Sequence, residues 1–219
     1  MVKYASGLHR HAALPGNKAR VIAPGVGGWN DYHFEQSTRK PTKMKVLSKS
    51  YFNRSTLVVA RSLLGKYLIR QNGKGTLAGK IVEVEAYVGP QDKACHASKG
   101  RTARTEVLFG PPGMSYVYLI YGMYHCLNVV TEKAEFPAAV LIRAVEIDGE
   151  LVDGPGRLCR VLDIDRTLNR IDMTTRKHLW FEDRGTKVPR GKIRTFPRIG
   201  VAYAGEWARK LWRFRFVDE

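Results

Sequence analysis

The segment Ile81–Tyr87 alternates between apolar and polar side chains, which predicts a β-strand with two unlike faces. Because successive side chains of a strand point to opposite faces, Glu83, Glu85 and Tyr87 share one face and three apolar residues share the other. Two carboxylates on one strand face are unusual unless they are solvated or functional. This face is therefore either an exposed polar surface with ion pairs to Lys and Arg, or the position of a general base that activates water.

Strand and turn signals on either side of this segment predict one α+β domain rich in antiparallel strand, with helices at its edge. Asn53 or Ser55 is a suitable N-cap for a helix that runs through Leu64, and Gly65 is a suitable C-terminal stop. A second, short helix is expected over residues 157–162. The predicted strands cover residues 67–70, 79–88, 115–130 (a long hairpin around Gly122), 139–145, 178–182, 198–202 and 212–217.

The charge of the chain favours a polyanionic partner. Its 219 residues include 37 Lys and Arg against 20 Asp and Glu, a formal net charge of +17. Nucleic acid is the commonest such partner, although a basic surface also serves solubility or attraction to anionic lipid. Residues 1–46 hold eight basic and two acidic residues and a loop-like Pro-Gly-Val-Gly-Gly stretch, so we expect a basic, flexible extension before a domain over residues 47–219. Met44 directly precedes the globular pattern and is a hypothetical alternative start.

Three further features of the sequence limit the cellular compartment in which the protein is expected. The chain has no apolar run near the ~20 residues that cross a bilayer, and its first residues do not resemble a secretory signal. Cys95, Cys126 and Cys159 are widely spaced and odd in number, which argues against a disulfide framework or a cysteine zinc site and favours buried thiols. We expect an intracellular monomer, in the cytoplasm or nucleoid of a bacterium or the nucleus of a eukaryote, with no membrane, metal or other cofactor.

A tyrosine-rich hairpin is the second motif that suggests a function. Four tyrosines lie between residues 116 and 124, and Gly122 suits the positive φ of a tight turn. Tyr118 and Asn128 each lie five residues from Met123, so strand pairing is predicted to place them nearly opposite one another. The hairpin either folds onto the core or presents Tyr121 and Met123 at an apolar tip. On a basic protein, such a tip suits insertion between stacked bases.

The remaining polar motifs are weak when each is taken singly. His96, in the segment Asp92–His96, is either a structural hydrogen-bonding group or a catalytic one, and the basic loop Lys99–Arg104 is either solvated or a phosphate contact. Arg143 ends an apolar strand, and a partly buried arginine generally needs a carboxylate or phosphate partner.

Taken together and in this order, these motifs closely resemble the alkyladenine (3-methyladenine) DNA glycosylase family. The matching stretches span roughly residues 48–216 and include GKIVEVEAYVGPQDKACH, FGPPGMSYVYLIYGMYHCLNVV, AAVLIRAVE, DGPGRLCRVL and PRIGVAYAGEWARK. EAYVGP followed by YVYLIYGMY and GPGRL is a specific combination. The resemblance implies a curved, largely antiparallel sheet, an open barrel like the C-terminal domain of formyltransferases, with edge helices and a protruding β-hairpin.

The resemblance also implies a reaction on double-stranded DNA. A damaged purine of the 3-methyladenine, hypoxanthine or ethenoadenine type is flipped out of the duplex, and an activated water hydrolyses its N-glycosidic bond to leave an abasic site. The nucleophile is water and not a lysine amine, so the enzyme is expected to be monofunctional and to cut no strand. A cationic lesion leaves without much help from an acid, whereas a neutral lesion also needs a proton donor, which the sequence does not identify.

The implied site residues fall into four groups. The catalytic pair, which activates and flanks the water, is Glu85 and Arg143. The base pocket, with stacking rings and an asparagine that crowds the amino group of guanine, is Tyr87, His96, Tyr118 and Asn128. The side chain that enters the space vacated in the duplex is Tyr121, and Met123, beside it at the predicted apolar tip, is a second candidate. The candidates for phosphate contacts are Arg101, Arg104, Arg157 and Lys210, together with the helix N-terminus at Gly154-Pro155-Gly156.

Some features depart from the family, and one alternative function stays open. The segment between Glu146 and Asp153 is much shorter than the usual insertion, Ala103-Arg104-Thr105 replaces a frequent Pro-Arg-Asn, and the sequence ends at Glu219 where relatives continue. The alternative is a non-catalytic RNA- or DNA-binding module on the same scaffold. Retention of Glu85 and Arg143 favours the enzyme, because a binding module has no use for an aligned carboxylate.

Overall fold

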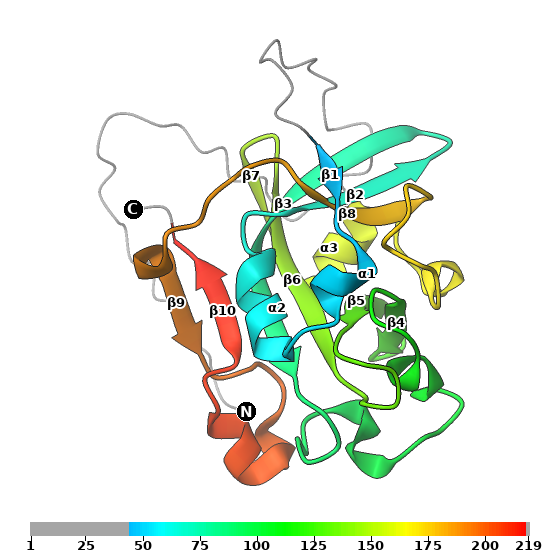
Figure 1. The fold of residues 1–219 in the computed structure, drawn as a ribbon, viewed down its shortest axis with the longest axis vertical. Helices are drawn as coiled ribbons and strands as arrows, with labels where there is room; N and C mark the ends of the chain where they lie inside the picture. The colour runs from blue at the N-terminus through cyan, green and yellow to red at the C-terminus, as the bar shows by residue number, and fades with distance from the viewer. Residues whose placement is uncertain (1–43, 218–219) are drawn as a thin grey trace, which may run out of the picture.

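The computed structural model describes residues 44–217, and one antiparallel sheet forms the body of this part of the chain (Figure 1). Its ten strands are β1 (Lys45–Val46), β2 (Tyr67–Asn72), β3 (Gly75–Tyr87), β4 (Ser115–Ile120), β5 (Tyr124–Val130), β6 (Ala139–Ile147), β7 (Glu150–Asp153), β8 (Leu179–Asp183), β9 (Ile193–Phe196) and β10 (Arg213–Phe216). The main path runs β1-β8-β2-β3-β6-β5-β4, while β7 pairs with β6, β10 with β3, and β9 with β10. The sheet curls into a half-barrel, which confirms the predicted α+β fold with a curved antiparallel sheet.

Short helices cover the sheet and its ends. They are α1 (Lys49–Phe52), α2 (Thr56–Leu63), α3 (Pro155–Val161) and the 3₁₀ helices η2 (His96–Lys99), η3 (Glu106–Phe109), η4 (Arg166–Leu168), η5 (Arg190–Lys192) and η6 (Ala202–Arg209). Helix α2 packs on β3 and β6, and α3 packs on β5, β6 and β7 (Figure 1). The predicted helix from Ser55 is confirmed: Ser55 occupies the N-cap position of α2, and Gly65 follows it with a φ of 78°. No helix among residues 44–217 is both long and apolar enough to cross a bilayer.

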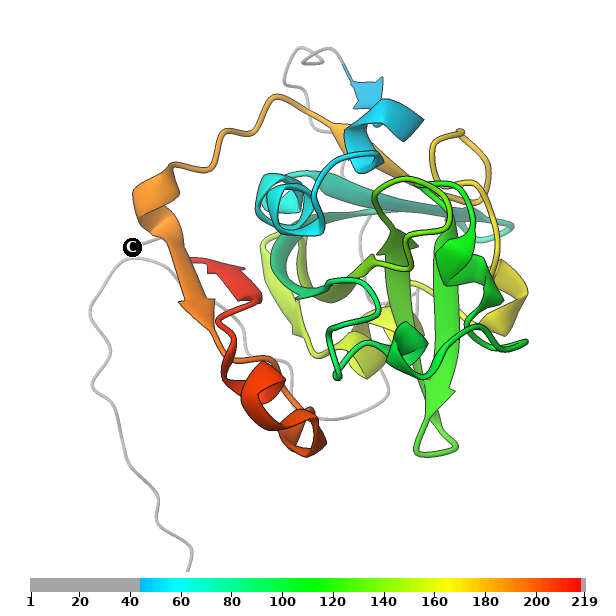
Figure 2. The same ribbon diagram turned by 60° about the horizontal axis from the view of Figure 1, so that its bottom comes forward.

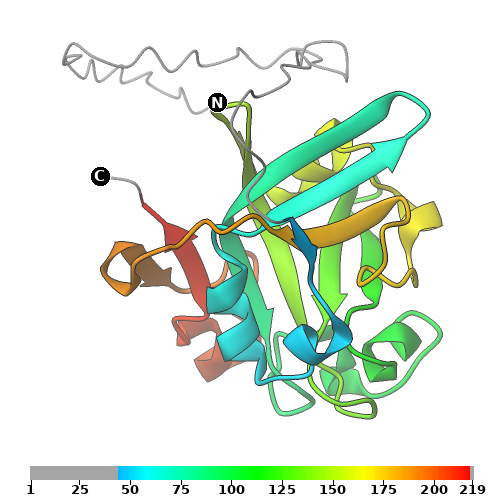
Figure 3. The same cartoon turned by 45° about the horizontal axis from the view of Figure 1, so that its top comes forward.

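Most of the predicted basic extension lies outside the described residues. Its last two residues, Lys45 and Val46, form β1 and pair with Asp183 and Glu182 of β8. The strands β1, β7 and β9 were not predicted; each has only two to four residues and little room for a periodic pattern. Strand β3 also begins at Gly75, four residues before the predicted start, because β2 and β3 pair as far as their connecting turn (Figure 3).

The long strand β3 is the centre of the sheet. One of its edges pairs first with β2, over residues 75–80, and then with β10, over residues 83–85. Its other edge pairs with β6, with a register shift around Glu83. Val84 and Ala86 face the main apolar core below α2. Glu83 and Glu85 therefore lie in the middle of the sheet on the opposite face, with a strand on each side.

The tyrosine-rich hairpin is confirmed, but its predicted register is wrong. Tyr118 pairs with Cys126, and Asn128 pairs with Tyr116, two residues from the expected partner. The turn residues with positive φ are Tyr121 and Gly122, and the N–H of Met123 donates to the carbonyl of Ile120, so the pairing is centred on Gly122 and not on Met123. A shift of two residues preserves the faces, so Asn128 and Tyr118 still share one. The tip projects beyond the neighbouring loops (Figure 2).

The strand predicted over residues 198–202 is absent, and a loop leads into η6 instead. No backbone-to-backbone strand pairing occurs in this segment among the described residues, and the hydrogen bonds of Arg198 and Ile199 involve side chains. The N–H of Ile199 donates to the carboxylate of Glu85, and the side chain of Arg198 binds Asp92. Gly200, with a φ of 75°, breaks the extended backbone.

The close packing of β3 on β6 predicts that Gly79 is unusually sensitive to substitution. A Cβ on Gly79 would lie 2.8 Å from the Cβ of Val145 on β6, an atom that cannot move without the backbone. We expect Gly79→Ala to lower the free energy of unfolding by about 1–3 kcal/mol through overpacking. Gly73→Ala is the control, because nothing lies within 4 Å of a Cβ at Gly73. Urea denaturation that gives equal stabilities for the two variants would contradict this account of the packing.

Candidate active site

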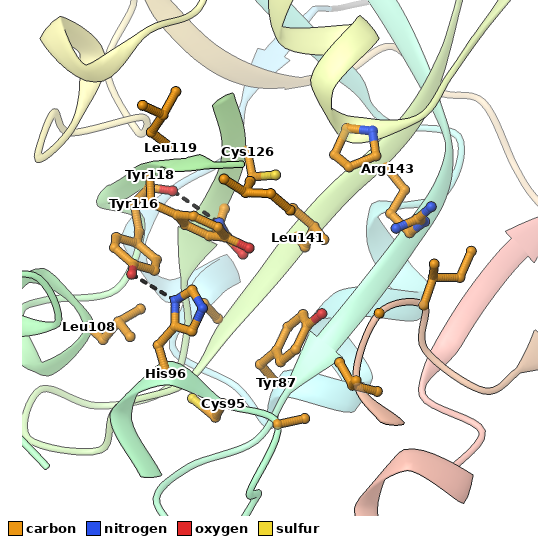
Figure 4. A pocket seen from close by; sticks show the side chains of 18 of the residues that line it. Tyr87, Cys95, His96, Leu108, Tyr116, Tyr118, Leu119, Cys126, Leu141 and Arg143 are labelled. Carbon is orange, nitrogen blue, oxygen red and sulfur yellow. Dashed lines mark hydrogen bonds between the residues drawn. The ribbon is translucent and has the colours of Figure 1, made fainter. Parts of the chain in front are cut away.

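A cavity of about 390 Å³ opens between the β4–β5 hairpin, η2, the end of β3 and the loop before η6 (Figure 4). Of the predicted catalytic and base-pocket residues, those that line it are Tyr87, His96, Tyr118, Asn128 and Arg143. Arg104 and Tyr121, predicted to contact DNA, also border it. The predicted residues come from segments that are up to about 60 positions apart in the sequence, so the fold alone brings them together.

Aromatic rings face one another across this cavity. Tyr87 lies on one side, and His96 and Tyr118 lie on the other (Figure 4). The rings of His96 and Tyr118 meet edge to face, with centroids 4.6 Å apart. Burial raises the pKa of both tyrosine phenols, so both are neutral at physiological pH. The space between the two sides is suited to a flat aromatic ligand.

The carboxylate of Glu85 is held directly behind the cavity wall. Its Oε1 accepts a hydrogen bond from the N–H of Ile199 (2.8 Å) and lies 3.5 Å from Nη1 of Arg143, and its Oε2 accepts from the hydroxyl of Tyr87 (2.8 Å). These three residues line the cavity, whereas Glu85 itself is 0% exposed. Burial raises the pKa of Glu85, while Arg143, the Ile199 N–H and the Tyr87 hydroxyl oppose that rise. The exposed-surface interpretation of this strand face is therefore wrong.

Glu83 lies on the same strand face but has a different environment. Its carboxylate binds Arg143 (3.2 Å), Arg213 (2.9 Å) and Arg215 (3.3 Å), and the residue is 1% exposed. Since Arg213 and Arg215 belong to β10, these ion pairs fasten β10 to β3. Arg143 contacts both carboxylates and so has the partner that its burial requires.

Residues 50–219 match the methylpurine-DNA glycosylase family. The chain belongs to this family. A relative from Methanocella arvoryzae is 54% identical over 187 residues, which cover 78% of this chain and 92% of the relative. Relatives from Myxococcus xanthus (51% over 181 residues; 80% and 92%) and Legionella pneumophila strain Corby (48% over 178 residues; 80% and 96%) are similar. All three carry the provisional name 3-methyladenine DNA glycosylase. The resemblance predicted from the sequence is confirmed, and the protein is a DNA glycosylase.

The buried ion pair between Arg198 and Asp92, which positions one side of the glycosylase cavity, was not predicted from the sequence. Arg198 binds both carboxylate oxygens of Asp92 and donates to the carbonyl of Ala86, and its guanidinium carbon lies 4.8 Å from the centre of the Tyr87 ring. The pair therefore places the neighbouring N–H of Ile199 on Glu85 and supports Tyr87 from behind. The available signal was an arginine between Pro197 and Ile199, which was interpreted as part of a strand.

The other predicted residues occupy varied environments in the glycosylase. Tyr121 and Met123 are 81% and 66% exposed at the hairpin tip. Arg101 forms ion pairs with Glu106 and Glu135, and the guanidinium of Arg104 lies 5.2 Å from the centre of the Tyr118 ring. Arg157 is exposed on α3, and exposed Lys210 lies 5.7 Å from the centre of the Trp207 ring. Their contacts with DNA stay predictions.

Two observations concern metal and thiol chemistry. Among residues 44–217, no group of three or more His, Cys, Asp or Glu side chains is arranged to hold a metal ion. Cys95, Cys126 and Cys159 are buried thiols, as predicted, and burial raises the pKa of Cys95 and Cys126 to about 11. Cys126 also lines the cavity.

Substitution of Glu83 and of Glu85 is predicted to have different effects on stability. Glu83→Gln leaves three arginines without the carboxylate they share, so we expect a loss of about 3–5 kcal/mol in the free energy of unfolding. Glu85→Gln removes a charge that burial disfavours and keeps Arg143 paired with Glu83, so we expect little change or a gain at neutral pH. Each variant is the control for the other in urea denaturation, and equal losses would refute the distinction.

Proposed function

We propose that this glycosylase flips an alkylated or deaminated purine out of duplex DNA into the aromatic cavity and hydrolyses its N-glycosidic bond. The substrates are purines of the 3-methyladenine, hypoxanthine and ethenoadenine type, and the product is an abasic site. The observation that carries the proposal is the buried Glu85 carboxylate, oriented by the Tyr87 hydroxyl, the Ile199 N–H and Arg143 at the wall of a ring-lined cavity. A module that only binds nucleic acid has no need of such a group.

The chemical step uses water as the nucleophile. Glu85 accepts a proton from the water while the oxygen of that water forms a bond to C1′ of the deoxyribose. The bond between C1′ and the purine nitrogen breaks, and its electron pair leaves with the base, through an oxocarbenium-like sugar that a carboxylate stabilises, as in glycoside hydrolysis. Because Glu85 has no exposed surface, the water must take a place now covered by the Tyr87 hydroxyl or the Arg143 guanidinium. A small shift of either group gives that access.

Aromatic stacking supplies the recognition of the flipped base. A base between Tyr87 on one side and His96 and Tyr118 on the other contacts the faces or edges of three rings. For a cationic lesion, each favourable ring contact adds about 0.5–2 kcal/mol of cation–π attraction. Asn128 lines the same cavity and is buried, which supports its proposed contact with the position where guanine carries an amino group. Adenine-type lesions are thereby favoured over guanine.

The hairpin tip is the proposed wedge that fills the vacated space in the duplex. Tyr121 and Met123 are large apolar side chains exposed on a chain of net charge +17. Inserted between neighbouring bases, they replace the stacking lost when the target nucleotide leaves. Electrostatic attraction to the DNA phosphates is supplied by the basic residues among residues 1–46 and by the candidate phosphate contacts Arg104, Arg157 and Lys210. Arg101 can contact a phosphate only if it exchanges or shares its carboxylate partners, Glu106 and Glu135.

Glu85→Gln tests the proposed catalyst. We expect the variant to bind a duplex with one hypoxanthine as the native protein does, while single-turnover excision falls by at least about 10²-fold, because the amide cannot accept the proton from water. Glu146→Gln is the control, since Glu146 is a paired carboxylate of β6 outside the cavity lining. Undiminished release of hypoxanthine or 3-methyladenine by Glu85→Gln would refute the assignment. Absence of release by the native protein from any modified duplex would instead favour the non-catalytic binding module.

Tyr121→Ala tests the wedge. Loss of a stacking ring costs about 1–3 kcal/mol, so we expect excision from duplex DNA under subsaturating conditions to fall about tenfold or more. Excision from the same sequence as a single strand should change little, because no base stack has to be refilled. Leu211→Ala is the control, since Leu211 is a 52% exposed apolar residue outside the tip. An equal loss on duplex and single strand would show that Tyr121 serves another purpose.

A further inference from the structure

A second large aromatic side chain is exposed at the mouth of the cavity, across from the hairpin tip. Among residues 44–217, the most exposed large hydrophobic side chains are Tyr121 (81%), Tyr203 (69%) and Met123 (66%). Tyr121 and Met123 form the tip, whereas Tyr203 belongs to η6, and both tyrosines line the same cavity. The hairpin and η6 project from the same side of the domain (Figure 2). The mouth of the cavity therefore has an exposed aromatic ring on each side.

The backbone that carries Tyr203 is held in place by packing and by one arginine. Val201 and Ala204, before and after it, are buried in a small apolar cluster. The side chain of Arg198 donates to the carbonyl of Trp207, which ties the segment before η6 to the far end of that helix. An exposed ring on an anchored backbone loses little conformational entropy when it binds a partner. Tyr203 is thus suited to an intermolecular contact, although its exposed ring adds little to the stability of the domain.

The proposed reaction determines where the lesion strand has to run. For water activated by Glu85 to reach C1′, the deoxyribose of the flipped nucleotide must come close to that carboxylate. Ile199 lies at the same place, because its N–H donates to the Glu85 carboxylate (2.8 Å). The side chain of Ile199 is 52% exposed, and it lines the cavity together with Gly200, Val201 and Tyr203. A strand that enters the cavity at this sugar and leaves it again therefore passes over the segment that ends at Tyr203.

We propose that Tyr203 is a second DNA-contact residue, whose ring packs on a deoxyribose of the lesion strand beside the flipped nucleotide. A deoxyribose presents carbon and hydrogen atoms that can remove the exposed ring from water. This contact depends neither on base pairing nor on the chemistry of the lesion, so it is made alike with duplex and single-stranded DNA. Tyr121 differs, because its proposed role is to fill a gap that exists only in a duplex. The inference rests on the proposed function for the position of the sugar.

Tyr203→Ala tests this contact in a Glu85→Gln background, in which the lesion is bound but not excised. We expect the Kd for an oligonucleotide with one hypoxanthine to rise about tenfold, the equivalent of about 1.4 kcal/mol, and by the same factor for duplex and single strand. Tyr203→Phe should restore binding, because it keeps the ring and removes only a hydroxyl whose contact with the carbonyl of Ala94 is long, at 3.4 Å. Val58→Ala is the control, since Val58 is a 48% exposed apolar residue of α2 outside the cavity lining.

The loss should affect binding and not the chemical step. With Glu85 in place, Tyr203→Ala should raise the enzyme concentration that gives half-maximal single-turnover excision and should leave the rate at saturation unchanged. The physical reason is that the ring contacts the strand equally before and during cleavage of the glycosidic bond. Urea denaturation should show no loss of stability in Tyr203→Ala, because the side chain that it removes is largely exposed.

The same measurements state what would overturn the proposal. An unchanged Kd in Tyr203→Ala would exclude the contact, and an equal loss in Tyr203→Phe would show that the hydroxyl and not the ring is responsible. A loss confined to duplex DNA would make Tyr203 a second wedge in place of a strand contact. If the native protein released no base from any modified oligonucleotide, the proposed function would fail, and the comparison of Kd values would still decide whether Tyr203 contacts DNA.

Discussion

Two carboxylates are buried on one face of β3, and the rest of the structure is arranged to satisfy them. A buried carboxylate is tolerated only with cations or hydrogen-bond donors around it. Glu83 receives three arginines from β6 and β10, and the result is a strong link between strands. Glu85, two residues further along, receives one more distant arginine and two neutral donors, and its pKa rises. The same residue type thus holds the sheet together at Glu83 and, two residues further on, is a buried carboxylate with a raised pKa behind the cavity wall.

The donors around Glu85 depend on a second buried ion pair. Arg198 and Asp92 lock the segment before η6 against the end of β3, which brings Ile199 to the carboxylate and a guanidinium to the rear of Tyr87. Ion pairs therefore lie behind the walls of the cavity, while its inner surface combines aromatic rings with aliphatic side chains and includes Asn128, Arg104 and Arg143.

The hairpin tip shows a local conflict that suits the proposed contact with DNA. Tyr121 has a φ of 52°, a conformation that costs a bulky residue about 1–3 kcal/mol, and its side chain is largely exposed. Neither feature stabilises the domain. A turn with two residues of positive φ nevertheless matches the twist of the strands and keeps the tip narrow. The stability that the tip lacks is supplied by the core beneath α2 and α3.

The sequence by itself determined the strand with its two faces, the tyrosine-rich hairpin, helix α2 and the family, because alternation, turn residues and ordered motifs are local properties of the chain. Through the resemblance alone, it also predicted five of the residues that line the cavity: Tyr87, His96, Tyr118, Asn128 and Arg143. The tertiary structure alone decided that Glu83 and Glu85 are both buried and that they have different partners. Glu83 pairs with arginines more than 100 positions away, whereas Glu85 accepts a hydrogen bond from the N–H of Ile199. It likewise decided the hairpin register and the loop at Arg198. The turn determines which hairpin register has the lowest free energy, and the distant ion pair determines the conformation of the loop. The local sequence pattern decides neither.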